Sequence, residues 1–490
     1  MKRWLPLLFL LWLPLAGATS HVFLVQNSGW MEPFYSDPHS RFKPLVAEVI
    51  KAAVQPKDVL VLASFNQSLP GAPSPKALLA TNAAGMRDKL DAALARLAVA
   101  AKPGAATLAD TDLNEALDAA INSALGGKGG LVWLFTNNRN SPNNDLSTAR
   151  RNRDFYELIH QGTAIRSAYA YPMYMPVQGK QYSANGLMLY VFAVGEDGAR
   201  QLDALMASTR LGHVLTEAPA RLKPLDQDTV RLVPVRVEDA PGVSFTVAPN
   251  GMLQANVESK ARTPQAKIIW KLENTIYPYT IAHATVAARS VLGGEDKPIM
   301  LDGSDVNGLA PGKGQPLQSR VALPVAQVPA DWSLAALKAA GSAYVLPGRI
   351  EVELAEQQLE LSQGFRQRMA ALFPGDPLPD IFTPPARIRA SHAVLPMEVR
   401  VQFGMAPLVT VLAATLAMLA AGAAATMAMT RPRKAYLIVD GEARVMQARA
   451  GSSEPIYDRA GQQVAQLKTT FFGHQLTDLR DGAQVRLGRS

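Results

Sequence analysis

Between residues 21 and 212, short apolar runs alternate with longer segments in which apolar side chains recur every three or four positions. A run that is apolar on both faces is typical of a strand buried inside a sheet, and the longer recurrence is typical of an amphipathic helix. Strands are therefore expected at 21–26, 58–65, 130–136, 164–171 and 186–194, and helices at 42–53, 84–99, 113–125, 151–161 and 198–211. This order predicts a Rossmann-like, doubly wound α/β domain over residues 19–215, with a parallel sheet that binds ligands at the carboxyl ends of its strands.

Residues 225–400 have a different pattern, in which apolar and polar side chains alternate over short runs bounded by Pro, Gly or Asn. Such alternation is typical of antiparallel strands with one face in a core. The runs lie at 229–238, 243–249, 252–259, 266–273, 279–288, 318–325 and 348–356. They predict an all-β region of one or two immunoglobulin-like sandwiches. Helical insertions are expected at 334–340 and 361–372, a proline-rich connecting loop at 372–385, and further strands within 386–403.

The first residues have the three parts of a secretory signal peptide. Lys2 and Arg3 form a basic start, residues 4–15 are apolar, and Ala16-Gly17-Ala18 is a run of small residues suited to cleavage. The alternative is an uncleaved membrane anchor. About fifteen apolar residues interrupted by prolines are short for crossing a bilayer, which favours removal of residues 1–18.

A second apolar segment, residues 407–429, carries no charged side chain and is long enough to cross a hydrocarbon core of about 30 Å as a transmembrane helix. The alternative is a buried helix of a soluble protein. Arg431, Arg433 and Lys434 follow at once, and basic residues stay on the cytoplasmic side. We therefore expect a single-pass protein of the bacterial-type inner (cytoplasmic) membrane, with the N-terminal part exported to the periplasm and the tail, residues 431–490, in the cytoplasm.

Small side chains recur at intervals of four along this apolar segment, as at Ala417, Ala421 and Ala425. Such spacing lets two helices approach closely, so it predicts homo- or hetero-association in the membrane, or alternatively an alanine-rich span without a partner.

The basic tail suits anionic lipid headgroups. Its Asp-Gly turn and apolar runs predict a small β-rich domain. The strands of this domain are expected at 435–439, 443–448, 462–471 and 483–488.

Composition excludes several classes of function. The 490-residue chain has no cysteine, which excludes disulfide scaffolds, iron–sulfur clusters, thiol nucleophiles and zinc sites with Cys ligands. The net charge of +8 is spread along the chain, whereas a protein that binds nucleic acid concentrates its basic residues on one face. The seven histidines lack metal-binding spacing, and neither a G-x-S-x-G turn nor a phosphate-binding loop is present. We therefore expect no enzymatic activity and no nucleic-acid partner.

Three loops of the α/β domain fall at the edge where ligands are expected. The first, residues 26–30, reads Gln-Asn-Ser-Gly-Trp and follows the first strand. The second holds Thr111 and Asp112 ahead of a helix, and the third begins at Asn137 and Asn138 after the central strand. Their order and spacing resemble the von Willebrand factor type A family, over about two fifths of the chain. That family has a metal-ion-dependent adhesion site, with Asp-x-Ser-x-Ser after the first strand, a Thr in a middle loop and an Asp after a later strand.

The resemblance implies a degenerate adhesion site. Gln26 and Asn137 stand where the family has aspartates, and Trp30 stands where it has the second serine, while Ser28 and Thr111 are retained. Mg²⁺ prefers hard oxygen ligands and gains affinity from carboxylates. Either Ser28 and Thr111 still hold Mg²⁺ or another divalent cation, with nearby acidic residues compensating through water, or the site holds no cofactor.

In the second case the loops form a protein-binding edge, because exposed Trp and Asn side chains suit that role. The residues expected to form this edge are Gln26, Asn27, Ser28, Trp30, Thr111, Asp112, Asn137 and Asn138. Two alternatives stay open at single positions. Trp30 is packed under the loop that follows it, or it is exposed, and the acid pair Asp110 and Asp112 marks the start of a helix or serves the site.

Two functions therefore remain in view. The first is a membrane-anchored, exported protein-binding module of adhesion or scaffold type, which grips a protein partner with the strand-end loops. The second is a structural subunit of an envelope assembly of several proteins, in which those loops are silent. Both place the chain in contact with protein partners and with the lipid bilayer.

Overall fold

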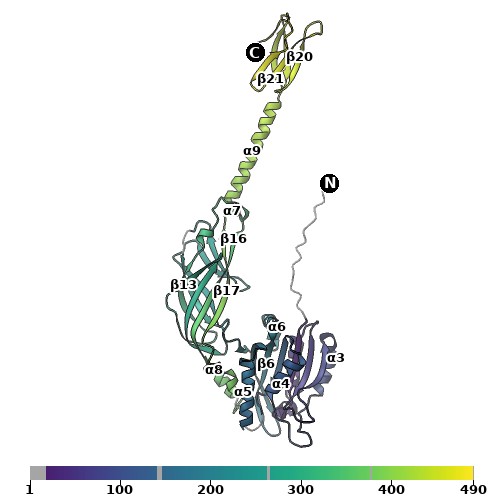
Figure 1. Ribbon diagram of the computed structural model, residues 1–490, viewed down its shortest axis with the longest axis vertical. Helices are drawn as coiled ribbons and strands as arrows, with labels where there is room; N and C mark the ends of the chain where they lie inside the picture. The colour runs from purple at the N-terminus through teal and green to yellow at the C-terminus, as the bar shows by residue number, and fades with distance from the viewer. Residues whose placement is uncertain (1–17, 141–145, 262–264, 376–377, 489–490) are drawn as a thin grey trace. The chain divides into compact units, whose positions relative to one another are not determined.

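The computed structural model describes residues 18–140, 146–261, 265–375 and 378–488 (Figure 1). The predicted signal peptide therefore lies outside the described residues, except for Ala18. The chain divides into two compact units. The first takes in the chain up to Gln327 together with Val345–Arg400, and the second combines Val328–Tyr344 with Val401–Ser490.

The first unit begins with a mixed α/β domain. Its seven-stranded sheet has the order β3-β2-β1-β4-β6-β5-β7. β1 (Ser20–Gln26) lies between β2 (Val59–Phe65) and β4 (Gly130–Thr136), and these three strands run parallel, as predicted. Because they are central and parallel, their carboxyl ends meet at one edge of the sheet.

The other half of this sheet is antiparallel, which corrects the prediction of a parallel sheet. β5 (Ile165–Gln178) and β6 (Ser183–Val194) form a hairpin, and β6 also runs antiparallel to β4. The reason is the connection, because the four residues between β5 and β6 are too few for the crossover that a parallel pair needs. The edge strands β3 (Lys76–Asn82) and β7 (Ala220–Lys223) were not predicted, since β3 has no fully buried side chain and β7 has only four residues.

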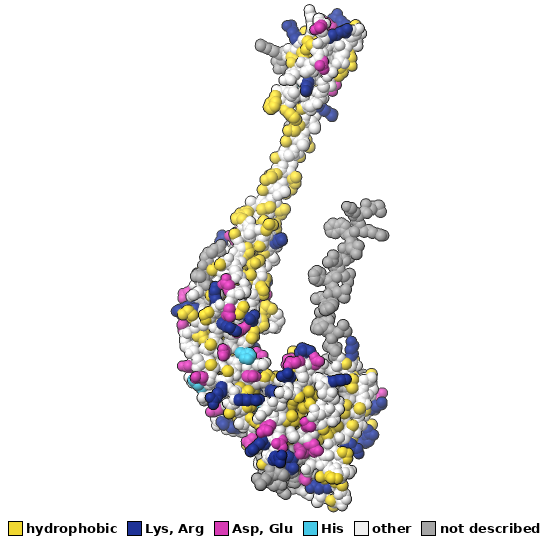
Figure 2. Space-filling view, in the orientation of Figure 1, with side chains coloured by type: hydrophobic (Ala, Val, Ile, Leu, Met, Phe, Trp, Pro, Cys, Tyr) yellow, Lys and Arg dark blue, Asp and Glu magenta, His cyan; other side chains and the backbone are white. Residues whose placement is uncertain are grey.

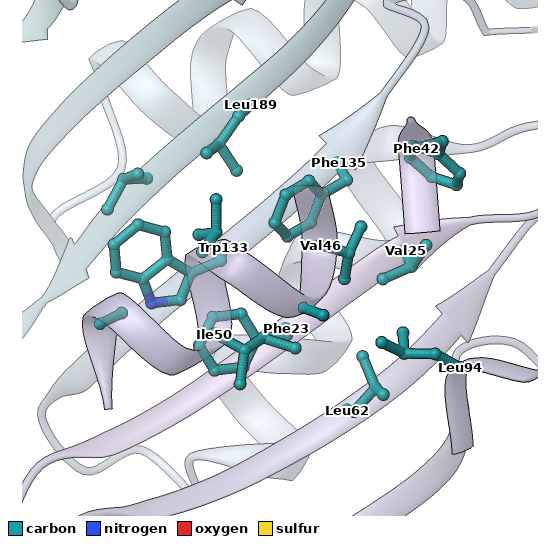
Figure 3. Packing of buried hydrophobic residues seen from close by; sticks show 14 of the residues in the cluster. Phe23, Val25, Phe42, Val46, Ile50, Leu62, Leu94, Trp133, Phe135 and Leu189 are labelled. Atoms are coloured by element: carbon teal, nitrogen blue, oxygen red, sulfur yellow. The ribbon is translucent and has the colours of Figure 1, made fainter. Parts of the chain in front are cut away.

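Helices cover both faces of the sheet, as the doubly wound pattern predicts. Along β1, Phe23 and Val25 face one hydrophobic cluster while Val22 and Leu24 face the other. Figure 3 shows the first cluster, in which side chains of β1, β2 and β4 pack against those of α2. The helical elements of the domain are η1 (Gly29–Met31), α1 (Glu32–Ser36), α2 (Phe42–Ala53), α3 (Ala83–Ala95), α4 (Leu113–Ala119), the π-turn η2 (Ala120–Ala124), α5 (Leu146–His160), α6 (Gly195–Ala207) and η3 (Leu211–His213).

The segment between the strands β16 (Ala343–Leu361) and β17 (Ser391–Gln402) of the β-rich region completes the α/β domain. It holds α8 (Gln363–Leu372) and η5 (Leu378–Phe382), which lie against α5, β5 and β6 (Figure 1). Phe365 and Phe382 are buried in the cluster of the α/β core and meet edge to face at 4.9 Å. The prediction of a simple connecting loop over 372–385 is therefore corrected for its described residues, because Phe373, Ile381 and Phe382 are part of a hydrophobic core, whereas 376–377 lie outside the described residues. The chain leaves the β-rich region, packs on the α/β domain and returns.

A buried histidine fastens this returning segment. His160 is 3% exposed, and its Nε2–H donates to the carbonyl of Ile381 at 2.9 Å. Arg387, five residues after Phe382, donates to the backbone carbonyl of His160 at 2.6 Å. Burial, together with the positive charges of Lys223 and Arg387, lowers the pKa of His160 to about 4, although the hydrogen bond to Ile381 opposes this shift.

This histidine makes the stability of the domain depend on pH. Its pKa in the fold, about 4, lies below its value in the unfolded chain, so its neutral form stabilises the fold fully above pH 6.5. We expect the free energy of unfolding to fall by up to about 3 kcal/mol as the pH drops from about 6.5 to about 4. The His160→Gln variant keeps an amide donor but does not titrate. Chemical denaturation of both proteins across this range measures the difference, and a difference that does not change with pH would contradict the assignment.

The strands of the β-rich region are linked by hydrogen bonds into one ten-stranded, sandwich-like sheet. Its ten strands have the order β8-β11-β15-β13-β12-β16-β17-β10-β9, and β14 pairs with β12. The two ends of this order meet, because Phe245 of β9 contacts the buried ring of Trp270 of β11 edge-on at 5.9 Å. The strands are β8 (Val230–Glu238), β9 (Val243–Val247), β10 (Leu253–Glu258), β11 (Gln265–Asn274), β12 (Tyr279–Leu292), β13 (Glu295–Leu301), β14 (Asp305–Leu309), β15 (Gly314–Ala322), β16 (Ala343–Leu361) and β17 (Ser391–Gln402). β13 and β14 were not predicted, since most of their side chains are exposed.

The second unit contains the apolar helix and the tail. Among the described residues, α9 (Ala406–Thr430) is the one helix that is long and apolar enough, by length and composition, to cross a membrane. Hydrophobic side chains line most of its visible surface (Figure 2). In the tail, β18 (Arg433–Val439) and β19 (Glu442–Ala448) form the predicted hairpin, with Asp440 and Gly441 at positive φ in its turn. The remaining elements of this unit are α7 (Leu334–Lys338), β20 (Ser453–Tyr457), β21 (Gln463–Thr470), β22 (Gly473–Thr477) and β23 (Val485–Leu487), whereas η4 (Val325–Gln327) is the last element of the first unit before residue 328.

Candidate functional site

The three loops meet at the carboxyl ends of β1 and β4. Gly29 donates its amide hydrogen to the carbonyl of Ala109 at 2.8 Å, which joins the first loop to the second. A side chain at Gly29 would place its Cβ only 2.8 Å from the Cβ of Leu108, so this approach requires glycine. Asn137 donates its side-chain amide to the carbonyl of Trp30 at 3.0 Å, which joins the third loop to the first. The predicted convergence of the loops is confirmed.

The side chain of Gln26 occupies the centre of the site. Its Nε2 donates one hydrogen to Ser28 Oγ at 2.7 Å and the other to Thr111 Oγ1 at 2.9 Å. Its Oε1 accepts from the hydroxyl of Thr136 and from the backbone amide of Asn137 at 3.1 Å. The amide of Gln26 is therefore satisfied at all four hydrogen-bonding positions while its side chain is completely buried. The backbone donor at Asn137 fixes which way the amide points.

This arrangement uses the oxygens that the resemblance implies as metal ligands. The hydroxyl of Thr111 also donates to Ser28, so both hydroxyl oxygens already accept from the Gln26 amide or from each other. Both residues are completely buried. Among the described residues, no group of three His, Asp or Glu side chains is placed to hold a metal ion. A divalent cation at Ser28 and Thr111 would have to displace the amide of Gln26 without gaining a carboxylate ligand, so the residues present fit such an ion poorly.

The two asparagines of the third loop are structural groups of the loop. Asn138 has a φ of 65°, accepts a hydrogen bond from the hydroxyl of Tyr190 on its side-chain oxygen, and is completely buried. Asparagine tolerates this left-handed conformation better than most residues. Asn137 is 3% exposed, and its side-chain oxygen accepts from the amide of Arg139 at 3.3 Å. The prediction that both side chains are available at a binding edge is therefore wrong.

Asp112 caps the helix α4, which resolves one of the open alternatives in favour of a helix start. Its Oδ1 accepts the amide hydrogen of Glu115 at 3.0 Å. Burial raises the pKa of the Asp112 carboxyl above its ordinary value. Asp110 instead pairs with Lys102 at 2.7 Å.

Asn27 holds the first loop to its neighbours. Its Nδ2 donates to the carbonyl of Ala98 at 3.2 Å, and its Oδ1 accepts from the side chain of Asn66 at 3.1 Å. The side chain is half-buried. Of the eight residues predicted to form the edge, only Asn27, Trp30 and Asp112 therefore reach the surface at all.

Trp30 is held by two residues that sequence reasoning missed. The ring of Tyr182, from the β5–β6 turn, meets the indole edge-on at 5.2 Å, and the guanidinium of Arg139 lies over it at 4.7 Å. Tyr182 also donates its hydroxyl hydrogen to the carbonyl of Trp30. Arg139 makes a further bond to the carbonyl of Pro374 at 2.7 Å. Trp30 is thus packed by a residue of the β5–β6 turn and by an arginine, and it remains half-buried.

We call Trp30, Arg139 and Tyr182 the rim cluster. The indole Nε1–H of Trp30 and the Oε1 of the adjacent Glu32 lack hydrogen-bond partners within the described part of the chain. The other carboxylate oxygen of Glu32 accepts from the amide of Lys180 at 3.0 Å. The cluster therefore places two aromatic rings and a guanidinium, all half-buried, above the hydrogen-bonded loops, and a buried carboxylate oxygen of Glu32 lies beside them.

Neither a scan against protein-family models nor a search of the curated proteins finds a match to this chain.

Proposed function

We propose that this chain is a membrane-anchored, exported protein-binding module, built on a von Willebrand factor type A-like domain, and that it contacts its partner through the rim cluster. The observation that supports this most is the combination of Trp30, Arg139 and Tyr182 at the meeting point of the strand-end loops. Tryptophan, tyrosine and arginine dominate the energetics of protein interfaces. Since the three side chains already fix one another, little conformational entropy is lost when a partner binds.

In this proposal the adhesion site works without a metal ion. The amide of Gln26 takes the central place by joining Ser28, Thr111, Thr136 and Asn137. These buried residues position the rim cluster, and they do not contact the partner themselves. The proposal also includes the predicted topology, with a signal peptide, a periplasmic part, the single membrane-spanning helix at α9 and a cytoplasmic tail. The exposed apolar surface of α9 supports the anchor.

A structural subunit of an envelope assembly is the second candidate. The observation in its favour is that most residues of the expected edge are buried, as a silent site requires. The spacing of alanines in α9 offers such a subunit a way to associate within the membrane.

Site-specific photo-crosslinking in cells separates the two candidates. A benzophenone amino acid replaces Gln181, which is exposed and precedes Tyr182. We expect a crosslinked protein species that becomes at least about tenfold weaker when Trp30→Ala or Arg139→Ala is added, because truncating an interface anchor costs about 2 kcal/mol. Trp332→Ala is the matched control, since this tryptophan is 62% exposed and lies outside the α/β domain. Ser28→Ala would be a poor test, because Ser28 is buried in the base of the site.

If the crosslinked species persists in the Trp30→Ala protein, or if none forms, the rim cluster does not bind a partner. Co-purification of an intact membrane assembly under those conditions would then favour the structural subunit.

A further inference from the structure

A buried carboxylate lies beside the first described strand. Asp58 is 4% exposed, just ahead of β2. Its Oδ1 accepts the backbone amide hydrogen of Thr19 at 2.8 Å, and its Oδ2 accepts that of Gln55 at 2.6 Å. Burial raises the pKa of Asp58, but the hydrogen bonds from His21, Gln55 and Thr19 outweigh burial and bring the pKa below its ordinary value. The group is therefore a carboxylate at neutral pH.

Within the described residues, this carboxylate has no lysine or arginine as an ion-pair partner. Within the described part of the chain, His21 is the one basic side chain within 4.0 Å, with Nε2 at 3.4 Å from Oδ2. The indole N–H of Trp133 donates to Nδ1 of His21 at 3.1 Å, so Nδ1 acts as an acceptor there and His21 is not a permanent counter-charge for Asp58. A charge removed from water without a counter-charge costs several kcal/mol, and hydrogen bonds offset only part of this. A positive charge at Asp58 would thus stabilise the fold.

The predicted cleavage site supplies such a charge at this place. Ala16-Gly17-Ala18 ends immediately before Thr19. A signal peptidase that adds water across the Ala18–Thr19 bond leaves a carboxylate on Ala18 and an α-ammonium group on Thr19. That nitrogen is the atom that already lies 2.8 Å from Asp58 Oδ1. Thr19 itself is 8% exposed, and its carbonyl accepts from the amide of Val59 at 2.9 Å. This backbone hydrogen bond holds Thr19 against the residue that follows Asp58.

We propose that the Asp58 carboxylate binds the α-ammonium group of Thr19, and that removal of the signal peptide completes the α/β fold by forming a buried ion pair between these two groups. The inference rests on export, which is part of the proposed function. Processing converts the hydrogen bond between a neutral amide and the Asp58 carboxylate into an ion pair in which both groups are charged, and it supplies the counter-charge that the buried carboxylate lacks. A chain with any residue ahead of Thr19 keeps only the bond from the uncharged amide to the carboxylate.

The test compares two full-length proteins purified from membranes. One has the natural sequence, and the other has Gly-Ser inserted between Ala18 and Thr19, so that cleavage leaves two residues ahead of Thr19. Intact mass identifies each N-terminus. Asp58→Asn is made in both, because asparagine keeps an acceptor oxygen for Thr19 and loses the charge. Asp88→Asn, at an exposed position of α3, is the control for loss of a negative charge.

Two readouts are expected to agree. Asp58→Asn lowers the midpoint of thermal unfolding more in the protein that begins at Thr19 than in the extended one. Native labelling with an amine-reactive ester modifies the Thr19 amine roughly tenfold more slowly than the amine of the extended protein, since each unit by which an ion pair raises the pKa of an amine reduces its reactive form tenfold. Asp58→Asn removes this protection.

An equal effect of Asp58→Asn in the two proteins, or rapid labelling of the Thr19 amine, would overturn the ion pair and leave the proposed function intact. A mass that includes residues 1–18 would instead show that the signal peptide is retained, which would remove the premise of export as well.

Discussion

We expect Gln26→Leu to lower the free energy of unfolding of the α/β domain by at least about 3 kcal/mol, because each buried polar group left without a partner costs about 1–3 kcal/mol. Leucine has a similar size but no polar atom. It leaves the hydroxyls of Ser28, Thr111 and Thr136 and the amide of Asn137 without the partner that the Gln26 amide gives them. Chemical denaturation followed by fluorescence measures the loss.

Gln161→Leu is the matched control, since this glutamine is exposed at the end of α5, and we expect a change within about 0.5 kcal/mol. In the same experiment, millimolar Mg²⁺ should leave the unfolding midpoint of the natural protein unchanged, because Gln26 already fills the place that a cation would take. A clear stabilisation by Mg²⁺ would show that the site binds metal and that the amide moves aside. A natural-like stability for Gln26→Leu would show that the network is not needed by the fold.

The second large effect is expected at Phe382, which comes from far along the chain to the α/β core. Phe382→Ala removes a completely buried ring that packs on Phe365, and we expect a loss of about 3–5 kcal/mol. Hydrogen exchange measured by mass spectrometry should show the loss as faster exchange in β4 and β6, whose side chains share this core. The amides of β11, in the core of the β-rich region, should change less.

Phe472→Ala is the control for removing a phenylalanine ring, because Phe472 is completely exposed in the β21–β22 turn. We expect no measurable change in stability there. If Phe382→Ala behaved like Phe472→Ala, or if faster exchange appeared in β11 alone, the segment between β16 and β17 would not belong to the α/β core.

Local pattern was enough to predict much of the α/β domain. The bounds of β4 and α2 agree with the prediction at both ends, because each is a clean apolar run or a regular recurrence with a turn beyond it. The β5–β6 hairpin was missed because Pro172 and Pro176 lie within β5 and read as the end of a strand. The role of α8 was missed for another reason. Its periodicity predicted a helix, but a periodic pattern does not state which core the apolar face will meet.

The candidate site divides in the same way. Convergence of the loops could be predicted, since the carboxyl ends of neighbouring parallel strands share an edge. Burial could not, because Gln26, Ser28 and Thr111 are polar and look exposed when each is considered alone. They are buried because they satisfy one another across 85 residues of sequence. Tyr182 lies in the hairpin turn that was not predicted, so the rim cluster had no signal in the sequence beyond Trp30.

The path of the chain through α8 and η5 determines how the protein can be cut into pieces. A fragment that stops near residue 225 would keep every strand of the α/β sheet but would lack Phe365 and Phe382. The hydrophobic face of the sheet that these two rings cover would then be exposed to solvent. Such a fragment should aggregate during expression, whereas one that runs from Thr19 to residue 402 includes the residues that cover this hydrophobic face. The last strand of the α/β sheet ends at Lys223, and α8, which covers this sheet, begins more than 130 residues later in the sequence.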